Sequence, residues 1–208
     1  MTRIRVQIST SLDGFVAGPR QGIEDPLGVG GLALHEWLFE LAAWRRAHGL
    51  EGGEDSESSH VVEESLENVG ATVMGRGMFG GGDGPWGPWR GWWGSRPPFR
   101  MPVFVLTHHQ REPLELDGTT FHFVDGVERA YKQAVKAARG KDIALAGGAD
   151  VVRQFIAAGL VDEIWVNVVP LLLGDGTRLF DGLSGVRLEL VRTVETPGVV
   201  HLKYRVAS

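Results

Sequence analysis

Segments with the pattern of β-strands alternate along this chain with segments of helical periodicity, and that order most limits the folds open to it. The strand-like segments are residues 4–9, 71–74, 102–107, 119–124, 143–146 and 164–169, and the helical ones are residues 34–42, 62–69, 127–138 and 152–156. Strands that alternate with helices pair in parallel, because each helix carries the chain back across the sheet. Residues 187–194 and 199–206 have no helix between them and flank the turn Thr196-Pro197-Gly198, which predicts a hairpin. We therefore expect an α/β domain with a mostly parallel sheet and antiparallel strands at one edge.

Length and composition narrow the class of protein further. A chain of 208 residues without internal repeats or an interdomain linker suits one domain that spans residues 1–208. The absence of cysteine excludes a disulfide framework, a thiolate zinc site and a cysteine nucleophile. The net charge of -5, with no block of Lys or Arg, argues against DNA or RNA as a partner. No apolar run reaches the roughly 20 residues that span a bilayer, and no signal peptide is recognisable, so we expect a cytoplasmic protein.

Two segments are predicted to be loops. Residues 48–59 are acidic and nearly free of large apolar side chains, which favours a solvated loop. Residues 75–94 contain nine of the 30 glycines and four of the seven tryptophans, a glycine density at which no helix or strand pattern persists. The four tryptophans are Trp86, Trp89, Trp92 and Trp93. They could stack on a flat heteroaromatic substrate, form a local cluster beneath the loop, or pack against a second subunit.

The pattern with the most chemical content is ALAGGADVVRQFI, in which a predicted strand runs through Gly147 and Gly148 into a helix. Free backbone N–H groups and the positive end of the helix dipole bind phosphate, and glycines let a phosphate approach closely. A plain strand-to-helix turn is the alternative explanation, and the spacing is not the G-x-G-x-x-G of a Rossmann fold. The pattern leaves a phosphate site and a purely structural turn both open.

Polar side chains follow two other predicted strands. Arg76 comes shortly after the strand at residues 71–74, and Thr107 and His108 stand at the end of the strand at residues 102–107. The carboxyl ends of strands are where open α/β sheets bind ligands, and a guanidinium pairs well with phosphate. Together, the three polar places predict one groove for an extended, phosphate-bearing cofactor. The pair of His108 and His109 has no Asp, Glu or His partners at ligand spacing, so we expect no metal site.

The sequence lacks the G-x-S-x-G, G-x-x-x-x-G-K-[ST] and H-E-x-x-H patterns, which argues against serine hydrolases, P-loop nucleotide triphosphatases and zinc proteases. Other segments do form a familiar series: SLDGFVAG, VMGRGMF, PVFVLTHH, ALAGGADVVRQFIAAGLVDEIWVNVVPLLLGDGTRLF and the final hairpin. In that order they resemble dihydrofolate-reductase-like proteins over nearly the whole chain. The chain is most similar to the family that shares the reductase domain of bacterial bifunctional deaminase-reductases of riboflavin synthesis. The segment WGPWRGWWGSRPPF resembles a stand-alone branch of that family.

This resemblance implies a three-layer fold, with helices on both faces of a mostly parallel sheet and NADPH across the strand ends. The residues that it implies for cofactor binding are Gly75, Arg76, Thr107, His108, Gly147, Gly148 and Ala149. The last three, at the helix start, would hold the pyrophosphate, and Arg76, with Thr107 and His108, would surround the adenosine 2′-phosphate. The nicotinamide would lie beside residues 9–17.

Two departures from the family pattern bear on the substrate. The riboflavin-pathway reductases resemble one another in S-x-D-G-K, where this chain has Phe15 in place of the lysine, and they tend to carry Glu where it has Ala146. Both changes remove charge from the region where a phosphoribosyl-pyrimidine would bind. The true dihydrofolate reductases place a carboxylate on the first helix, where this chain has Glu36 and Glu40. We name Asp13 and Glu36 as candidate catalytic residues, although a D-G turn needs its Asp for backbone reasons and a surface Glu is common.

The sequence thus predicts an NADPH-dependent reductase that transfers hydride to a small, flat heterocyclic, carbonyl or imine substrate, pterin- or pyrimidine-like. The alternative is a non-catalytic nucleotide- or flavin-binding protein that keeps the reductase fold. We also predict a homodimer, because the resemblance suggests one and the terminal strands at residues 187–194 and 199–206 offer an edge for pairing. Trp165 and the tryptophans of residues 86–93 add aromatic surface of the kind enriched at interfaces.

Overall fold

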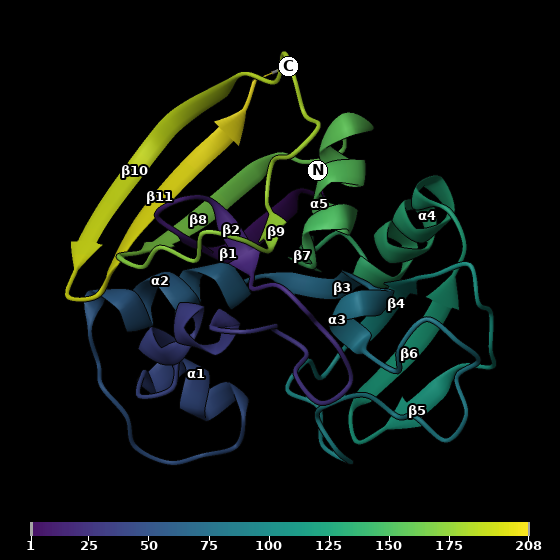
Figure 1. Cartoon of the computed structure of the whole chain (residues 1–208). Coiled ribbons are helices and arrows are strands. Elements are labelled where there is room, and N and C mark those ends of the chain that lie inside the picture. The colour runs from purple at the N-terminus through teal and green to yellow at the C-terminus, as the bar shows by residue number, and fades with distance from the viewer. Residues whose placement is uncertain (1, 208) are drawn as a thin grey trace.

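The computed structural model describes residues 2–207 and confirms the α/β class, with a large sheet at its centre (Figure 1). The sheet strands are β1 (Ile4–Ser11), β3 (Val69–Gly75), β4 (Pro102–Leu106), β5 (Leu114–Leu116), β6 (Thr119–Val124), β7 (Asp142–Gly147), β8 (Glu163–Val169), β10 (Leu188–Thr196) and β11 (Val199–Val206). Their order across the sheet is β10-β11-β8-β1-β7-β3-β4-β6-β5. From β8 to β6 every neighbouring pair is parallel, as the alternation of strands and helices predicts.

Antiparallel strands occur at both edges of the sheet. The predicted C-terminal hairpin is confirmed, since β10 pairs antiparallel with β11, and β11 pairs antiparallel with β8. At the other edge, β5 pairs antiparallel with β6. This strand has only three residues, which is too short for an alternating pattern to be recognised in the sequence. A separate small ladder joins β2 (Phe15–Ala17) to β9 (Thr177–Arg178).

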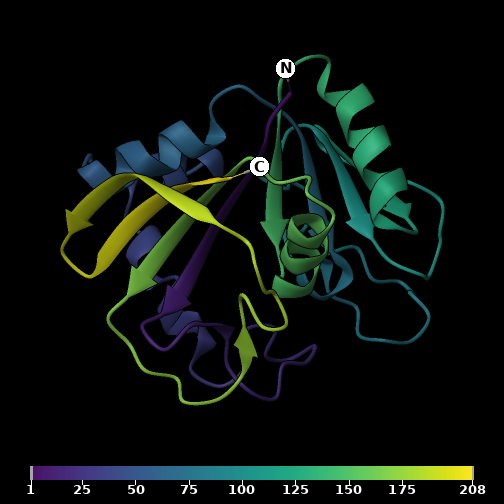
Figure 2. The ribbon, with the colours of Figure 1, turned by 90° about the horizontal axis from the view of Figure 1, so that it is seen from above.

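One face of the sheet is covered by α4 (Val127–Ala138) and α5 (Ala149–Ala157) (Figure 2). Because side chains alternate across a strand, every second residue of the parallel strands projects to this face. Val6 of β1, Leu145 of β7 and Phe155 of α5 belong to this core and are almost completely buried. The sequence pattern predicts α4 over the same residues that form it.

The other face is covered in two different ways. Over β8 and β10 lies α2 (Glu57–Leu66), against which α1 (Ala42–Ala47) packs. Over β4 and β6 lie the short α3 (Arg76–Phe79) and the tryptophan-rich segment of residues 80–99 that follows it. Phe79 of α3 and Trp86 of this segment belong to a second apolar core. Helices thus cover both faces, and a tryptophan-rich loop completes the second layer. No helix within residues 2–207 is long and apolar enough to cross a membrane.

The continuous helix predicted at residues 34–42 is wrong. This region forms two 3₁₀ turns, η1 (Gly31–Leu34) and η2 (Glu36–Leu38), before α1 begins at Ala42. The interruption has a tertiary cause: Leu41 is extended and forms an isolated bridge with Glu54. The N–H of Ala42 then donates to the carbonyl oxygen of Glu54 instead of continuing a helix.

The predicted boundaries around α2 also need correction. The predicted loop at residues 48–59 ends early, because α2 begins at Glu57, and the predicted helix at residues 62–69 ends at Leu66. Ser58 and Ser59 are buried even though they are polar. Each hydroxyl has a partner: Ser59 Oγ accepts a hydrogen bond from the N–H of Ala43 at 3.0 Å, and Ser58 Oγ lies 2.9 Å from His201 Nε2.

His201 on β11 is a polar side chain that is completely buried beneath α2. It is 0% exposed, and its Nδ1 lies 2.8 Å from Asn167 Oδ1, while its Nε2 faces Ser58. Both ring nitrogens of a neutral imidazole are thereby used, one as donor and one as acceptor. Burial, together with the charge of Arg192, lowers the pKa of His201 to about 4.

We predict that His201 makes the protein less stable as the pH falls. The unfolded chain takes up a proton on this histidine near pH 6.5, whereas the folded protein resists protonation until about pH 4. Protonation in this window therefore favours unfolding, by roughly 3 kcal/mol in total at about 1.4 kcal/mol per pKa unit. Urea unfolding of the wild type and of His201→Gln from pH 7 to pH 4 measures the difference in slope.

His60→Gln is the matched control, because His60 is an exposed histidine on α2. We expect this variant to keep the wild-type dependence on pH, and His201→Gln to flatten it. If the His201→Gln profile runs parallel to that of the wild type, the buried imidazole is not the group that responds.

Candidate functional site

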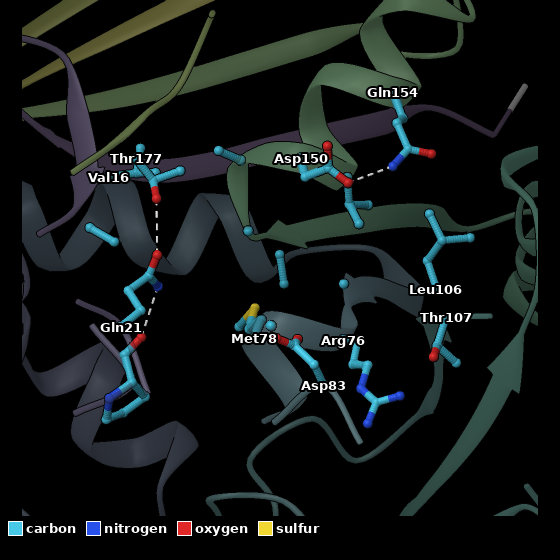
Figure 3. Close-up of a pocket in the computed structure, with 18 of the residues that line it drawn as sticks. Val16, Gln21, Arg76, Met78, Asp83, Leu106, Thr107, Asp150, Gln154 and Thr177 are labelled. Carbon is cyan, nitrogen blue, oxygen red and sulfur yellow. Dashed lines mark hydrogen bonds between the residues drawn. The ribbon is translucent and has the colours of Figure 1, made fainter. Parts of the chain in front are cut away.

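A cavity of about 800 Å³ lies at the carboxyl ends of the central parallel strands (Figure 3). Its lining at the strand ends includes Gly75, Leu106, Asp125, Ala146 and Gly148. The chain leaves β3 toward β4, but it leaves the neighbouring β7 toward β8, in the opposite direction. Ligands of open α/β sheets bind at such a reversal, because the diverging connections leave a crevice between them.

Six of the seven predicted cofactor residues meet in this cavity. The lining contains Gly75, Arg76, Thr107, His108, Gly148 and Ala149. Gly147 stands between two lining residues, its φ of 113° lies in the region that favours glycine, and its peptide bond to Gly148 is cis. The three segments with polar groups at strand ends, around Arg76, Thr107 and Gly148, therefore converge on one groove. Their part in binding a cofactor stays a prediction.

Two helix N-termini open onto the cavity without a side-chain cap. Gly148 is the N-cap of α5, and a Cβ built on it would meet nothing within 4 Å. Gly126 is the N-cap of α4 and also lines the cavity. The first N–H groups of a helix have no partners within it, so they attract an anion. The sequence of the second terminus is Asp125-Gly126, directly after β6. This dipeptide resembles an ordinary turn, so it does not by itself indicate a helix N-terminus at a cavity.

The guanidinium of Arg76 is fixed against the loop that follows it. Its Nε donates to the carbonyl oxygen of Gly82 at 2.8 Å, and its Nη2 donates to that of Gly84. Its carbon Cζ lies 4.1 Å from the ring centroid of Trp86. Nη1 is buried and has no hydrogen-bond partner in the part of the chain that the structure describes. A cation with an unpaired N–H group is costly unless a ligand supplies an acceptor, so Arg76 retains binding capacity toward an anion.

Thr107 and His108 stand side by side at the end of β4 but are exposed to very different degrees. Thr107 is buried, and its Oγ1 accepts a hydrogen bond from the N–H of His109 at 3.1 Å. The His108 side chain is 94% exposed, and its Nδ1 lies 2.8 Å from Asp125 Oδ1. An exposed pair of this kind is held weakly, so His108 can reorient toward an anion. Arg76, Thr107, His108 and His109 are called the Arg76 end of the cavity below. Within residues 2–207 no three His, Asp or Glu side chains are grouped closely enough to hold a metal ion.

The opposite end of the cavity, called the Gln21 end, consists of Val16, Ala17, Gln21, His35 and Thr177. Gln21 joins two of its walls: Nε2 donates to the carbonyl oxygen of Pro26 at 2.9 Å, and Oε1 accepts from Thr177 Oγ1 at 2.9 Å (Figure 3). Among the described residues that line the cavity, Arg76 is the only Lys or Arg, and it lies at the other end. The Gln21 end is therefore suited to an uncharged ligand group.

The loop of residues 18–31 forms the rim of the Gln21 end, and backbone contacts fix its path. A Cβ on Gly18 would lie 1.9 Å from the carbonyl oxygen of Val29, and a Cβ on Gly28 would lie 2.2 Å from that of Gly18. Only glycine permits backbone segments to approach so closely. The path of the rim thus depends on its glycines, in addition to the hydrogen bonds of the Gln21 side chain.

His35 is a candidate site residue that the sequence pattern does not identify. It follows η1, which packs on β1 and β2, and it lines the Gln21 end. Burial lowers its pKa from the ordinary value of 6.5. The imidazole is consequently neutral at pH 7 and can donate or accept one hydrogen bond at each nitrogen. A single histidine in an apolar periodic segment carries no signal of this role, because its surroundings depend on how the segment folds.

Neither predicted catalytic carboxylate lines the cavity. The carboxylate of Asp13 accepts hydrogen bonds from the N–H groups of Leu173 at 3.2 Å and Gly174 at 2.7 Å. A hydrogen bond from Ser11, together with these, lowers the pKa of Asp13 to about 2. Glu36 is exposed on η2. Asp13 thus ties the turn after β1 to the segment before β9, and catalytic roles for both residues stay predictions without geometric support.

The two departures from the family pattern lie in different surroundings. Ala146 lines the cavity, at the end of β7. Phe15 is buried, and the guanidinium of Arg178 lies 4.3 Å from its ring centroid. The loss of charge at Ala146 therefore affects the cavity wall directly, whereas Phe15 lies behind that wall.

The four loop tryptophans form a local cluster. Trp86 is buried in the second apolar core, and Trp89 and Trp93 are half-buried against it. The Nε1 of Trp89 donates to the carbonyl oxygen of Phe79 at 3.0 Å. Trp92 also contacts Trp89, with ring centroids 4.5 Å apart, but it differs from the other three because it lines the cavity. The clustered arrangement therefore includes Trp92, whose exposure to the cavity leaves stacking on a ligand as a prediction.

Comparison with known proteins gives one family match. The profile of the family described as "RibD C-terminal domain" matches residues 2–202. Two curated proteins of Bacillus subtilis (strain 168), both described as uncharacterized, are related in sequence: YwjB is 34% identical over 83 residues and YyaP is 36% identical over 116 residues. These matches cover 39% and 52% of this chain. The chain spans 48% of the length of YwjB and 61% of that of YyaP.

Solved structures show the same fold at low sequence identity. A protein from Shewanella sp. PV-4, described as a candidate riboflavin biosynthesis protein, has a TM-score of 0.64 at 21% identity, with both chains covered completely. Dihydrofolate reductase from Enterococcus faecalis, complexed with NADP(H), has a TM-score of 0.57 at 14% identity and covers 99% of this chain and 97% of its own. The bifunctional deaminase and 5-amino-6-(5-phosphoribosylamino)uracil reductase from Thermotoga maritima has a TM-score of 0.60 at 15% identity, over 99% of this chain and 57% of its own.

Proposed function

Because the chain belongs to the RibD C-terminal domain family, we propose that it is an NADPH-dependent reductase that transfers hydride to a small, flat substrate with a C=N or C=O bond. The observation that carries this proposal is the convergence of the α5 N-terminus, Arg76 and Thr107 on one cavity. Further support comes from two structures of the same fold, a dihydrofolate reductase complexed with NADP(H) and a deaminase/reductase.

The residues present fit a dinucleotide with a phosphate at its adenosine end. Gly148 leaves open space where any other residue would place a side chain, so the N–H groups at the start of α5 are accessible. Arg76 Nη1 has no hydrogen-bond partner among residues 2–207. Asp150, in the first turn of α5, brings a negative charge, but its carboxylate is engaged by Gln154 Nε2 at 2.6 Å and lies 3.7 Å from Arg153 (Figure 3). The cavity volume of about 800 Å³ lies within the range of roughly 300–1,000 Å³ usual for ligand sites.

When bound, NADPH supplies the hydride, and the protein supplies binding, orientation and exclusion of water. The N–H groups at the starts of α4 and α5 stabilise phosphate charge, and Arg76 adds a charge-assisted hydrogen bond. At the Gln21 end, Val16 and Ala17 present apolar surface that keeps water from the reacting atoms. Neutral His35 offers a hydrogen bond to the polar edge of an uncharged substrate, and Trp92 offers an aromatic face.

A second candidate function is binding of a nucleotide or flavin without turnover. One observation favours it: Asp13 and Glu36, the two carboxylates predicted to be catalytic, both lie outside the cavity lining. Fold alone does not separate a reductase from such a binding protein, because function belongs to the site. Oxidation of NADPH in the presence of an acceptor distinguishes the two functions, since the binding protein would hold the cofactor without consuming it.

We predict that NADPH binds about 10- to 100-fold more tightly than NADH, because a hydrogen bond between a charged donor and a phosphate is worth roughly 1.5–3 kcal/mol. Arg76→Ala should remove most of this difference and leave the affinity for NADH unchanged. Calorimetric titration of both cofactors measures it, with Arg90→Ala, an exposed arginine of the same loop, as the control. Equal affinities in the wild type would rule out recognition of the 2′-phosphate.

We predict that Gly148→Val abolishes cofactor binding and leaves the protein folded. The new side chain has room, because nothing lies within 4 Å of its Cβ, but it occupies the approach of a phosphate to the start of α5. Circular dichroism checks the fold, and titration with NADPH checks binding. Gly22→Val is the matched control, since Gly22 also has open space and is absent from the cavity lining. Normal NADPH binding by folded Gly148→Val would show that the two glycines are only structural.

We predict that the phosphoribosyl-pyrimidine of the riboflavin pathway is a poor substrate. Its phosphate would meet no Lys or Arg among the described residues that line the Gln21 end, and an unpaired buried phosphate is costly. NADPH oxidation followed by absorbance should be faster with uncharged pterins, pyrimidines or quinones than with this compound. Reduction of the phosphorylated pyrimidine at a rate comparable to that of the Thermotoga maritima enzyme would overturn the assignment of an uncharged substrate.

We also propose that the protein is a homodimer, paired through the β10 edge. Among the described residues, β10 pairs only with β11, so its outer edge is unpaired. Leu188, Leu190 and Val191 on this strand are exposed, as are Phe180 and Val186 before it. An apolar strand edge of this kind invites pairing, and a two-fold axis would use the same patch on both subunits.

Light scattering at micromolar concentration should give about twice the chain mass of 22.6 kDa. Leu190→Lys should shift the mass toward that of one chain, because a charge on the unpaired edge opposes association. Leu172→Lys is the control, since Leu172 is also exposed but lies outside β10. A wild-type mass of one chain at all concentrations would exclude the dimer.

A further inference from the structure

The tryptophan-rich segment contacts a cavity residue, Arg76, through Trp86, and the function proposed above assigns no role to this contact. Trp86 lies directly under the guanidinium of Arg76, with 4.1 Å between Cζ and the ring centroid. A cation over the face of an indole ring is attracted by the negative charge density of that face, and the attraction is greater where water is excluded. Trp86 is 9% exposed, so this contact is largely desolvated on the side of the ring.

The ring of Trp86 is itself held firmly. Its Nε1 donates to the carbonyl oxygen of His109 at 2.7 Å, which ties it to the segment that follows β4. Phe79 and Phe123 contact the ring, with centroids at 5.6 and 5.0 Å. The indole therefore connects the end of β4, where Thr107 and His108 stand, to the guanidinium that follows β3.

The loop holds the guanidinium from a second direction. Nε and Nη2 of Arg76 donate to the carbonyl oxygens of Gly82 and Gly84, which leaves Nη1 as the nitrogen without a partner. An arginine fixed in this way loses less conformational freedom when it binds an anion than a mobile one does. Nη1 is the only one of the three guanidinium nitrogens without an acceptor among the described residues.

We propose that Trp86 is a positioning residue for Arg76, and that it thereby determines the preference of this cavity for adenine nucleotides that carry a 2′-phosphate. This inference rests on the proposed function. It assigns the tryptophan-rich segment a role in cofactor selection through Trp86, in addition to its role in covering β4 and β6. The competing explanation is that Arg76 only anchors the loop, in which case Trp86 matters for stability and not for selection.

Two adenine nucleotides test this without hydride chemistry: adenosine 2′,5′-bisphosphate, which carries the 2′-phosphate, and adenosine 5′-monophosphate, which lacks it. Calorimetric titration of the wild type should show tighter binding of the bisphosphate. Trp86→Leu should reduce the ratio of the two affinities by about 5- to 10-fold, and leave the affinity for the monophosphate unchanged. Trp86→Phe, which keeps an aromatic face under the guanidinium, should retain the ratio within about twofold.

Trp93→Leu is the matched control. Trp93 belongs to the same segment and packs on Phe99 and Phe121, with centroids at 4.9 and 5.9 Å, but it has no cation–π contact with Arg76. It should keep the wild-type ratio even if it lowers stability. Arg111 is a second cation near Trp86, at 5.6 Å, but it does not line the cavity, so Arg111→Ala should also keep the ratio.

The outcomes separate the two proposals. If the wild type binds both nucleotides equally, recognition of the 2′-phosphate fails, and the role of Trp86 fails with it. A second outcome is that the wild type prefers the bisphosphate while Trp86→Leu keeps that preference or lowers the affinity for both nucleotides equally. In that case the proposed cofactor stands and the positioning role of Trp86 is overturned. Should Trp86→Leu not fold, Trp86→Met fills more of the same volume without an aromatic face, and the same loss of ratio is expected of it.

Discussion

Parallel pairing of the six central strands is the constraint on which the rest of this structure depends. Parallel strands all end at the same edge, so the segments after β3, β4, β6 and β7 must meet there. The reversal of direction between β3 and β7 then leaves a crevice at that edge, and α4 and α5 both begin beside it. The topology thus places the first N–H groups of two helices at this edge, and Arg76 adds a guanidinium to them.

The cavity divides its chemistry between two ends that are built by different means. At the Arg76 end, charge and donors come from residues at the ends of strands, whose positions the sheet fixes. At the Gln21 end, the walls come from β2, β9 and the loop between β2 and η1, and these are joined to one another through Gln21. Under the proposed function, the charged groups of the cofactor bind at the first end and an uncharged reacting group at the second. This separation of charge is the basis of the proposal that the substrate carries no phosphate at the Gln21 end.

Those parts of the fold with a local cause can be predicted from the sequence. The apolar repeat of α4 and the turn residues of the C-terminal hairpin lie within the segments they organise, and both elements are confirmed. The helix expected at residues 34–42 is wrong because its interruption depends on Glu54, which the periodicity of the segment cannot register. The same limit applies to Ser58, whose burial depends on His201.

The residues of the candidate site also divide into those with a local sequence signal and those whose position depends on distant residues. Gly148, Arg76 and Thr107 can be named from the sequence because each stands at the end of a predicted strand, and strand ends converge by geometry alone. His35 cannot be named in this way, because its place in the cavity depends on how η1 packs on β1 and β2. Asp13 is the converse case: its position in a strand-end turn suggests a functional carboxylate, and the nearby N–H groups of Leu173 and Gly174 hydrogen-bond to it, so its catalytic role stays a prediction.

In most binding loops the path of the backbone and the identity of the side chains that face the ligand depend on each other. The glycine contacts of the rim largely separate these two properties. At Gly18 and Gly28 the backbone of the loop touches itself, so close backbone contacts set most of its course, and the side chain of Gln21 adds hydrogen bonds to Pro26 and Thr177. Leu27 faces the cavity without such a bond, so it can be exchanged without removing a hydrogen bond that holds the loop. A protein with this rim can acquire a different ligand preference by substitution at a few positions while its architecture remains intact. Descendants of one such chain would share a backbone and differ in what they accept.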